Sequence, residues 1–133
     1  MNPAPTLHQL SHALAEGRTT SRSLAEACLA RIEDPRGEGM RTFVHVDADQ
    51  VRKTADSLDG MRGARARLSR FSGIPISIKD LFDVEGEVTK AGSKVLADAA
   101  PAVTDATVVD RLRRAGFLII GRTNMTEFAY SGL

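Results

Sequence analysis

The sequence contains one cysteine, almost no excess charge of either sign and no long apolar run. Because Cys28 has no second cysteine to pair with, an internal disulfide framework is excluded and a reducing compartment fits. Lys and Arg number 18 against 17 Asp and Glu, so no overall field attracts nucleic acid or anionic lipid. The apolar stretch of residues 117–120 is far too short to span a bilayer.

Two further patterns are missing. The first residues lack the basic segment and apolar run of a secretory signal, and no glycine-rich stretch matches a nucleotide-binding fingerprint. The rest is ordinary for a folded protein, with 42% hydrophobic and 26% charged residues in a length of 133, which suits one small domain. We therefore expect a cytoplasmic, soluble protein without a cofactor and without a membrane partner.

Apolar residues at helical spacing predict three helices in the first half of the chain. Gly17 is expected to end the first helix and residues 34–37 the second, because glycine and proline stop helices. A short strand is predicted at residues 42–46, from its β-branched and aromatic content. The expected N-caps of the three helices are Thr6, then Thr20 or Ser21, then Asp47.

The second half predicts a strand, a helix and a strand. In residues 74–79 the isoleucines alternate onto one face, so Ser77 and Lys79 fall on the other. Residues 117–120 form a continuous apolar run, typical of a strand covered on both faces. The helix between them is expected to be capped by Thr104 or Asp105, to turn Val108, Leu112 and Ala115 inward, and to end at Gly116. This βαβ order predicts an α/β fold with a largely parallel sheet.

Several residue types that can carry chemistry favour a structural role here. His8 and His12 have metal-ligand spacing but no third ligand, so exposed histidines are the preferred interpretation, and His45 is alone in a strand. Cys28 lies on the apolar face of a helix, which favours a buried, inert thiol. The arginines of the linker are interpreted as a solvated loop rather than an anion patch; they are Arg62, Arg65, Arg67 and Arg70.

Lys79 is the informative residue, and its spacing alone leaves two interpretations open. A lysine at the end of a strand, followed by Asp80, is most often an exposed charge. A lysine can instead act as a base, if burial and neighbouring hydroxyl groups favour its neutral form.

At this point the residues match a known family. Residues 73–86, Gly-Ile-Pro-Ile-Ser-Ile-Lys-Asp-Leu-Phe-Asp-Val-Glu-Gly, closely resemble the lysine-bearing segment of the amidase-signature family. Residues 91–93 resemble the turn that follows it, residues 105–116 its crossover helix, and residues 121–129 the loop that approaches its active site. The departures are small, since Arg122 stands where lysine is usual and Val88 where threonine is common.

The resemblance implies an α/β/α amidase-signature fold with a mixed, largely parallel central sheet and N-terminal helices. Residues 1–133 would then be the N-terminal portion of a single amidase domain. Residues from about 1 to 60 would form a helical N-terminal segment, and residues 73–133 the start of the catalytic α/β core.

The resemblance also implies a Ser–cis-Ser–Lys triad of which this chain supplies only Lys79. The family's Gly/Ser-rich block would follow Leu133, so the 133-residue chain alone is expected to be inactive. Asn124 and Ala129 are expected near the substrate cleft, although the Asn124 side chain could equally tie down its loop.

Three functions stay open from the sequence. The first is an amidase that hydrolyses a carboxamide, a small-molecule substrate. The second is the A subunit of a tRNA-dependent amidotransferase, the one case in which nucleic acid is an expected partner. The third, from another class, is a catalytically incomplete chain with a binding role or no independent role, which the coding sequence after codon 133 would distinguish. We expect the remaining part of the domain, or a second copy, to cover the exposed strands.

Overall fold

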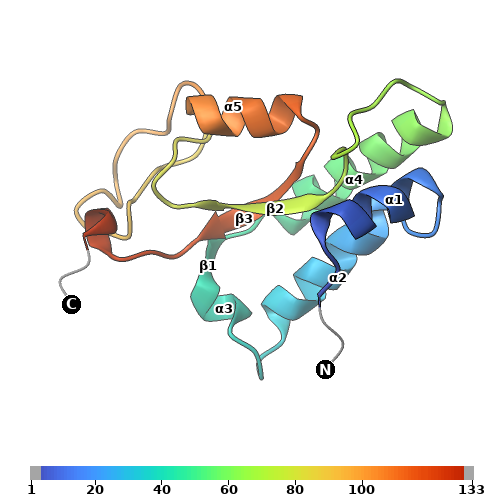
Figure 1. Cartoon of the computed structure of the whole chain (residues 1–133). Coiled ribbons are helices and arrows are strands. Elements are labelled where there is room, and N and C mark those ends of the chain that lie inside the picture. Colours follow the sequence, from blue (N-terminus) through green and yellow to red (C-terminus); the bar gives the residue numbers. More distant parts are fainter. Residues whose placement is uncertain (1–3, 131–133) are drawn as a thin grey trace.

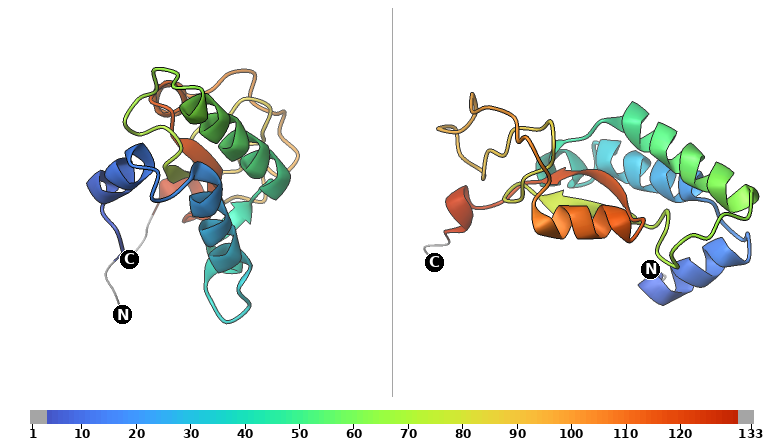
Figure 2. Two further views of the ribbon diagram at one scale, coloured as in Figure 1. Left: turned by 90° about the vertical axis from the view of Figure 1, so that its right-hand side faces the viewer. Right: turned by 90° about the horizontal axis from the view of Figure 1, so that it is seen from above.

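The computed structural model describes residues 4–130, which form three layers around a small sheet (Figure 1). Helix α5, Thr107–Arg114, covers one face of the sheet. Helices α2, Ser21–Glu33, and α4, Ala48–Gly63, lie side by side against the other face, as the view from above shows (Figure 2). Helix α1, Leu7–Ala15, lies next to α2 at the periphery. The α/β fold class is confirmed.

The helix starts of the first half are those that the sequence predicts. The caps Thr6, Thr20 and Asp47 each accept a hydrogen bond from a backbone N–H in the first turn, which satisfies a donor that the helix itself leaves free. The strand β1 is shorter than predicted, Phe43–His45, and a four-residue helix, α3, Gly39–Thr42, precedes it without having been predicted.

The sheet has the strand order β1-β3-β2. Strand β2, Pro75–Lys79, and strand β3, Leu118–Thr123, are parallel, as the βαβ pattern predicts, and β1 is antiparallel to β3. Pro75 is the first residue of β2, where its missing N–H costs least. Strand β3 begins one residue later and ends three residues later than its apolar run, because the polar residues that follow also pair.

A β-bulge in β3 changes the face of the sheet on which the later side chains of this strand lie. Ile76 lies opposite Ile119, but Ser77 lies opposite Gly121, so Ile120 has no partner on β2. An extra residue reverses the alternation of side chains beyond it. Arg122, opposite Ile78, therefore shares the α5 side with Ile119, while Lys79 and Thr123 point to the opposite side.

Strand β1 approaches β3 very closely at Gly121. The backbone of Gly121 has a φ of 155°, and a Cβ atom there would lie 2.5 Å from the carbonyl oxygen of His45. Only glycine allows this approach without a shift of the backbone.

Helix α5 differs from its prediction in its start and in its buried face. Neither Thr104 nor Asp105 caps it, because the N-cap is Ala106, whose N–H donates to the carbonyl of Asp83 at 2.9 Å. Asp105 instead accepts hydrogen bonds from the backbone of Glu85 and from a side chain within α5. The later start turns Val109 rather than Val108 toward the sheet, with exposed fractions of 0% and 41%. Leu112 and Ala115 are half-buried, and Gly116 follows the helix as predicted.

Two apolar clusters hold the layers together. One joins α2 and α4 to β3 through Ala25, Leu29, Val51, Ala55, Leu118 and Ile120. The other joins α5 to the opposite face through Ile78, Val84 and Val109. The small residues Ala25 and Ala55 are fully buried, and they allow the two helices to approach closely.

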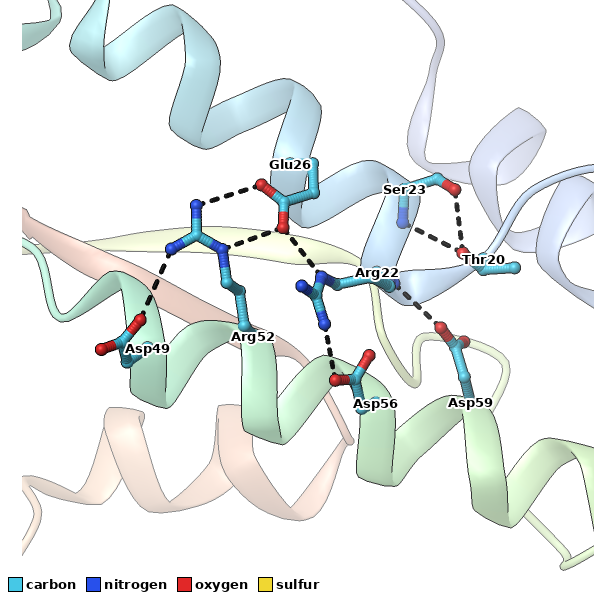
Figure 3. Close-up of polar contacts among 8 residues, drawn as sticks. All are labelled: Thr20, Arg22, Ser23, Glu26, Asp49, Arg52, Asp56 and Asp59. Carbon is cyan, nitrogen blue, oxygen red and sulfur yellow. Dashed lines mark hydrogen bonds and ion pairs between the residues drawn. The ribbon is translucent and has the colours of Figure 1, made fainter.

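An ion-pair network runs along the outer side of the α2–α4 contact (Figure 3). Glu26 of α2 accepts from Arg22 Nε at 2.8 Å and from Arg52 Nε of α4 at 2.9 Å. Arg22 also pairs with Asp56, and the carboxylate of Asp59 accepts from the backbone N–H groups that begin α2. The network thus sets the register of α2 against α4 while the apolar cluster supplies the burial.

Gly116→Ala is expected to destabilise the fold by about 2 kcal/mol or more, because a left-handed φ is strained with a side chain. The φ of Gly116 is 84°, and a Cβ atom would lie 2.2 Å from Ser72 Oγ. The matched control is Gly60→Ala, inside α4, where a Cβ meets nothing within 4 Å. That change should stabilise by up to about 1 kcal/mol. Equal effects of the two changes in urea denaturation would contradict the fold around Gly116.

The pH dependence of stability should change on Glu26→Gln. Hydrogen bonds from Arg52 and then Arg22 lower the pKa of Glu26 from 4.5 to about 2. Since the pKa is depressed in the folded state, this contribution to stability is present above about 4.5 and is lost as the pH falls to about 2. The free energies of unfolding of wild type and variant should therefore converge over this range.

The control for this titration is Glu33→Gln, because Glu33 has no ion-pair partner within residues 4–130. This change removes no ion pair, so it should leave the free energy of unfolding nearly unchanged. A difference between Glu26→Gln and wild type that does not change with pH would show that the network contributes nothing.

Candidate active site

Lys79 is the last residue of β2, at the carboxyl end of the parallel pair, opposite Thr123. Ligands bind at this end of parallel strands in open α/β sheets. The predicted alternation holds, since Ile78 is buried while Ser77 and Lys79 are exposed. Within residues 4–130, Lys79 therefore lies in solvent, on the side of the sheet opposite α5.

Behind Lys79, on the other side of the sheet, lies a buried ion pair that sequence reasoning did not single out. Arg122 Nε donates to Asp80 Oδ1 at 2.9 Å, and both side chains are 3% exposed. Nη2 of the same guanidinium donates to the carbonyl of Phe82 at 3.0 Å and to Thr89 Oγ1 at 3.2 Å, and Nη1 contacts Glu87 at 3.4 Å. Arg122 thus joins β3 to residues 80–89, the first part of the loop that follows β2.

Asp80 uses its main-chain groups as well as its carboxylate. Its N–H donates to the carbonyl of Thr123 at 3.0 Å, and its carbonyl accepts from Ala91 N–H at 2.9 Å. Its carboxylate also accepts from the N–H groups of Lys90 and Gly92, at 3.4 and 3.3 Å. The residue next to Lys79 is therefore fixed from three sides.

Two loops meet beside the carboxyl ends of the strands. The first contains residues 90–95, and the second contains the 3-10 turn η1, Glu127–Ala129. Phe128 N–H donates to the carbonyl of Ala91 at 2.8 Å, and Ser93 Oγ donates to Glu127 at 2.5 Å. Ser93 is 4% exposed, so this hydrogen bond is largely shielded from solvent at one end.

Three residues of these loops have a left-handed backbone although they carry side chains. The φ values are 50° at Ala91, 51° at Phe128 and 57° at Ala129. Such conformations cost of order 1–3 kcal/mol each and gather where structure serves function. The hydrogen bond between Ala91 and Phe128 holds two of the three in place.

Asn124 and Ala129 lie in the second loop, and both are exposed. Asn124 Nδ2 donates to the carbonyl of Arg41 at 3.3 Å, and its Oδ1 accepts from Met125 N–H at 2.9 Å. These are the contacts of a side chain that ties down its loop, which was one of the two interpretations of Asn124. A substrate contact by Asn124 or Ala129 stays a prediction.

The other candidate residues form no site with Lys79 among residues 4–130. The rings of His8 and His12 are 4.5 Å apart on α1, and within residues 4–130 no group of three acidic, histidine or cysteine side chains is arranged to hold a metal ion. His45 is exposed on β1. Cys28 is half-buried beside the α2–α4 cluster, and this burial raises the pKa of its thiol.

The linker arginines divide into two kinds. Arg62 belongs to the fold, because it donates to Asp59 at 3.1 Å and to the carbonyl of Ser72 at 2.6 Å. Arg65, Arg67 and Arg70 are exposed, as predicted for a solvated loop. In the described part of the chain, none of the helices combines the length and apolar character that crossing a membrane requires.

The comparisons with known proteins agree on one family. The Amidase family model matches residues 23–132. The chain is 38% identical over 122 residues to the AtzE component of 1-carboxybiuret hydrolase from Pseudomonas sp. (strain ADP), covering 92% of this chain and 26% of that protein. It is 40% identical over 124 residues to the A subunit of glutamyl-tRNA(Gln) amidotransferase from Chromohalobacter salexigens, covering 93% and 25%.

A solved structure gives the same result in three dimensions. It is described as a vestigial protein complex that reveals the evolutionary origins of an s-triazine catabolic enzyme, and it matches with a TM-score of 0.87 at 36% identity. The match covers 95% of this chain and 27% of that one. The chain therefore spans about a quarter of the length of the relatives it matches.

The contact between the two loops can be measured by a double-mutant cycle of Ser93→Ala and Glu127→Ala. We expect a coupling of about 1–2 kcal/mol in the free energy of unfolding, because the acceptor is charged and the donor is buried. The control is a cycle on Glu38 and Arg41, an exposed pair, which should couple by less than about 1 kcal/mol. No coupling between Ser93 and Glu127 would mean that the loops are not joined there.

Proposed function

The chain belongs to the amidase family, and from this we propose that the complete polypeptide hydrolyses the carbon–nitrogen bond of a carboxamide, with Lys79 as its base. The observation that carries the proposal is the position of Lys79. It ends a parallel strand, its neighbour Asp80 is fixed from three sides, and two strained loops meet beside it. Sites of chemistry commonly combine such a strand end with loops of sparsely populated backbone conformation.

In the proposed mechanism Lys79 is one member of a Ser–cis-Ser–Lys triad. Neutral Lys79 takes a proton from the cis serine, which takes one from the nucleophilic serine as that serine attacks the amide carbon. Backbone N–H groups near the nucleophile stabilise the oxyanion, the amine leaves, and water then hydrolyses the acyl-enzyme.

We assign both serines of the triad to sequence beyond this chain. Ser93 Oγ already donates to Glu127, and Ser72 is buried at the α5 turn, 3% exposed. Ser77 is exposed beside Lys79, but it lies inside the regular strand β2 and not in a glycine-rich turn. A serine nucleophile needs an adjacent oxyanion site, which turns rich in glycine provide.

The exposure of Lys79 fits the proposal that the two serines of the triad lie outside residues 1–133. A neutral lysine requires a shielded environment, which the described residues do not provide. We propose that residues 73–133 begin the catalytic core, with residues 1–60 as a helical segment packed on it. The remaining part of the amidase domain would then cover Lys79, with a second copy of the chain as the alternative.

A second candidate function is that of the A subunit of an amidotransferase. The 40% identity to the corresponding chain of a glutamyl-tRNA(Gln) amidotransferase favours it. That function differs in its use of a glutamine donor, partner proteins and a charged tRNA. Release of ammonia from glutamine that depends on added partner proteins would support it over a simple amidase.

Lys79→Ala in the complete polypeptide should lower kcat/KM for amide hydrolysis by at least about 10²–10⁴-fold, the usual loss when a general base is removed. The melting temperature should change little, because Lys79 is exposed in the described part and ends its strand. The matched control is Lys53→Ala, an exposed lysine on α4 outside the two loops of the candidate site, which should keep its activity. Near-normal kcat/KM in folded Lys79→Ala would rule out the assignment.

The proposal that residues 1–133 supply the lysine but neither serine can be tested on these residues alone. This chain should neither turn over amides nor react with a serine-directed fluorophosphonate. Stoichiometric labelling, located by mass spectrometry to a serine of this chain, would overturn the placement of the nucleophile.

A further inference from the structure

We propose that Arg122 and Asp80 are positioning residues of the proposed reaction, which fix Lys79 and the loop of residues 90–93 in their working geometry. The inference rests on the proposed function of Lys79 as the base. Neither side chain reaches the side of the sheet on which Lys79 lies, since both are 3% exposed and face the α5 side. They act on the reaction through the backbone.

The connection from Arg122 to Lys79 is short. Asp80 is the next residue along the chain, and its carboxylate is held between Arg122 Nε at 2.9 Å and the N–H groups of Lys90 and Gly92. The peptide that leaves Lys79 is therefore fixed by the Asp80 N–H bond to Thr123 and by the carboxylate together. This peptide and the Lys79 side chain are both bonded to the Cα atom of Lys79. A rotation of the peptide would therefore move the side chain.

The connection from Arg122 to the second loop is also continuous. Ala91 N–H donates to the carbonyl of Asp80, and the carbonyl of Ala91 accepts from Phe128 N–H. Ala91 and Phe128 both have a left-handed backbone, which persists only where neighbouring contacts impose it. The ion pair thus supports the strained residues of both loops, Ala91 and Phe128.

Stability alone is a weak reason for such a pair. Charges lose hydration on burial, and replacement of a buried ion pair by apolar residues of similar volume is often neutral or stabilising. The guanidinium also bonds to Phe82 and Thr89, but its charge-assisted hydrogen bond to Asp80 is the contact that reaches the residue next to Lys79. The geometry that this pair imposes is therefore a better explanation for its presence than net stability is.

The test measures kcat, KM and melting temperature for variants of the complete polypeptide. In Arg122→Met, kcat should fall by about 10–100-fold with KM within about 3-fold, because misplacement by about 1 Å is costly for catalysis. Arg122→Lys keeps a positive charge beside Asp80, the residue that follows Lys79, and should retain kcat within about 5-fold although the bonds to Phe82 and Thr89 are lost. The matched control is Arg114→Met, whose ion pair with Asp110 lies on the exposed side of α5, and it should leave kcat unchanged.

The decisive variant is the double change Asp80→Leu with Arg122→Met. A purely stabilising pair predicts that melting temperature and kcat recover together, because no charge is left buried. A positioning pair predicts that the melting temperature recovers and kcat stays low. Full recovery of kcat overturns the proposal, as does unchanged kcat in folded Arg122→Met. If the double variant does not fold, a kcat in Arg122→Lys as low as in Arg122→Met, at normal melting temperature, also overturns it.

Amide hydrogen exchange separates this proposal from the proposed function. The N–H groups of Ala91 and Gly92 should exchange at least about 10-fold faster in Arg122→Met than in wild type or Arg114→Met, because their acceptors belong to Asp80. If the wild type hydrolyses no amide, or if Lys79→Ala keeps its activity, the proposed function fails while the exchange rates still report on the pair. Unchanged exchange at both amides in Arg122→Met overturns the positioning role whatever the activity.

Discussion

The buried ion pair of Asp80 and Arg122 is the constraint on which the carboxyl ends of the strands depend. The apolar clusters bring the layers together through residues such as Leu118 and Ile120 of β3, and the second cluster reaches Ile78, one residue before the end of β2. Beyond β2 the chain enters a long loop, residues 80–106, in which the buried apolar residues are Val84 and Ala91. There the order comes from hydrogen bonds to one guanidinium and one carboxylate, which leave few alternative arrangements.

The helices of the first half could be predicted because their signals are local. A Thr or Asp cap acts within three residues, and the caps at Thr6, Thr20 and Asp47 formed as expected. The start of α5 could not, because Asp105 has a competing partner at Glu85, twenty residues away in sequence. With two adjacent valines, periodicity alone also could not decide which one faces the sheet.

For the candidate site, the sequence located Lys79 through a resemblance carried by a contiguous block. The ion pair behind it is spread over 42 residues, so no local pattern indicates it. One signal was available, because an arginine that continues an apolar strand must find a partner if it is buried. The face of β2 on which Lys79 lies could be predicted from alternation, whereas the contact of the two loops depends on backbone conformations at Ala91 and Phe128 that no propensity favours.

The bulge at Ile120 ties the face of Arg122 to the register of the two parallel strands. Ile120 is the residue of β3 between two paired residues that has no partner on β2, and this turns Arg122 to the α5 side. If Ile120 paired with Ser77 instead, Arg122 would lie opposite Lys79 and point toward α2 and α4. Asp80 would then remain buried without a counter-charge. A slip of one residue in the register is thus equivalent here to the removal of an ion pair, and the bulge is as much a determinant of the site as the residues themselves.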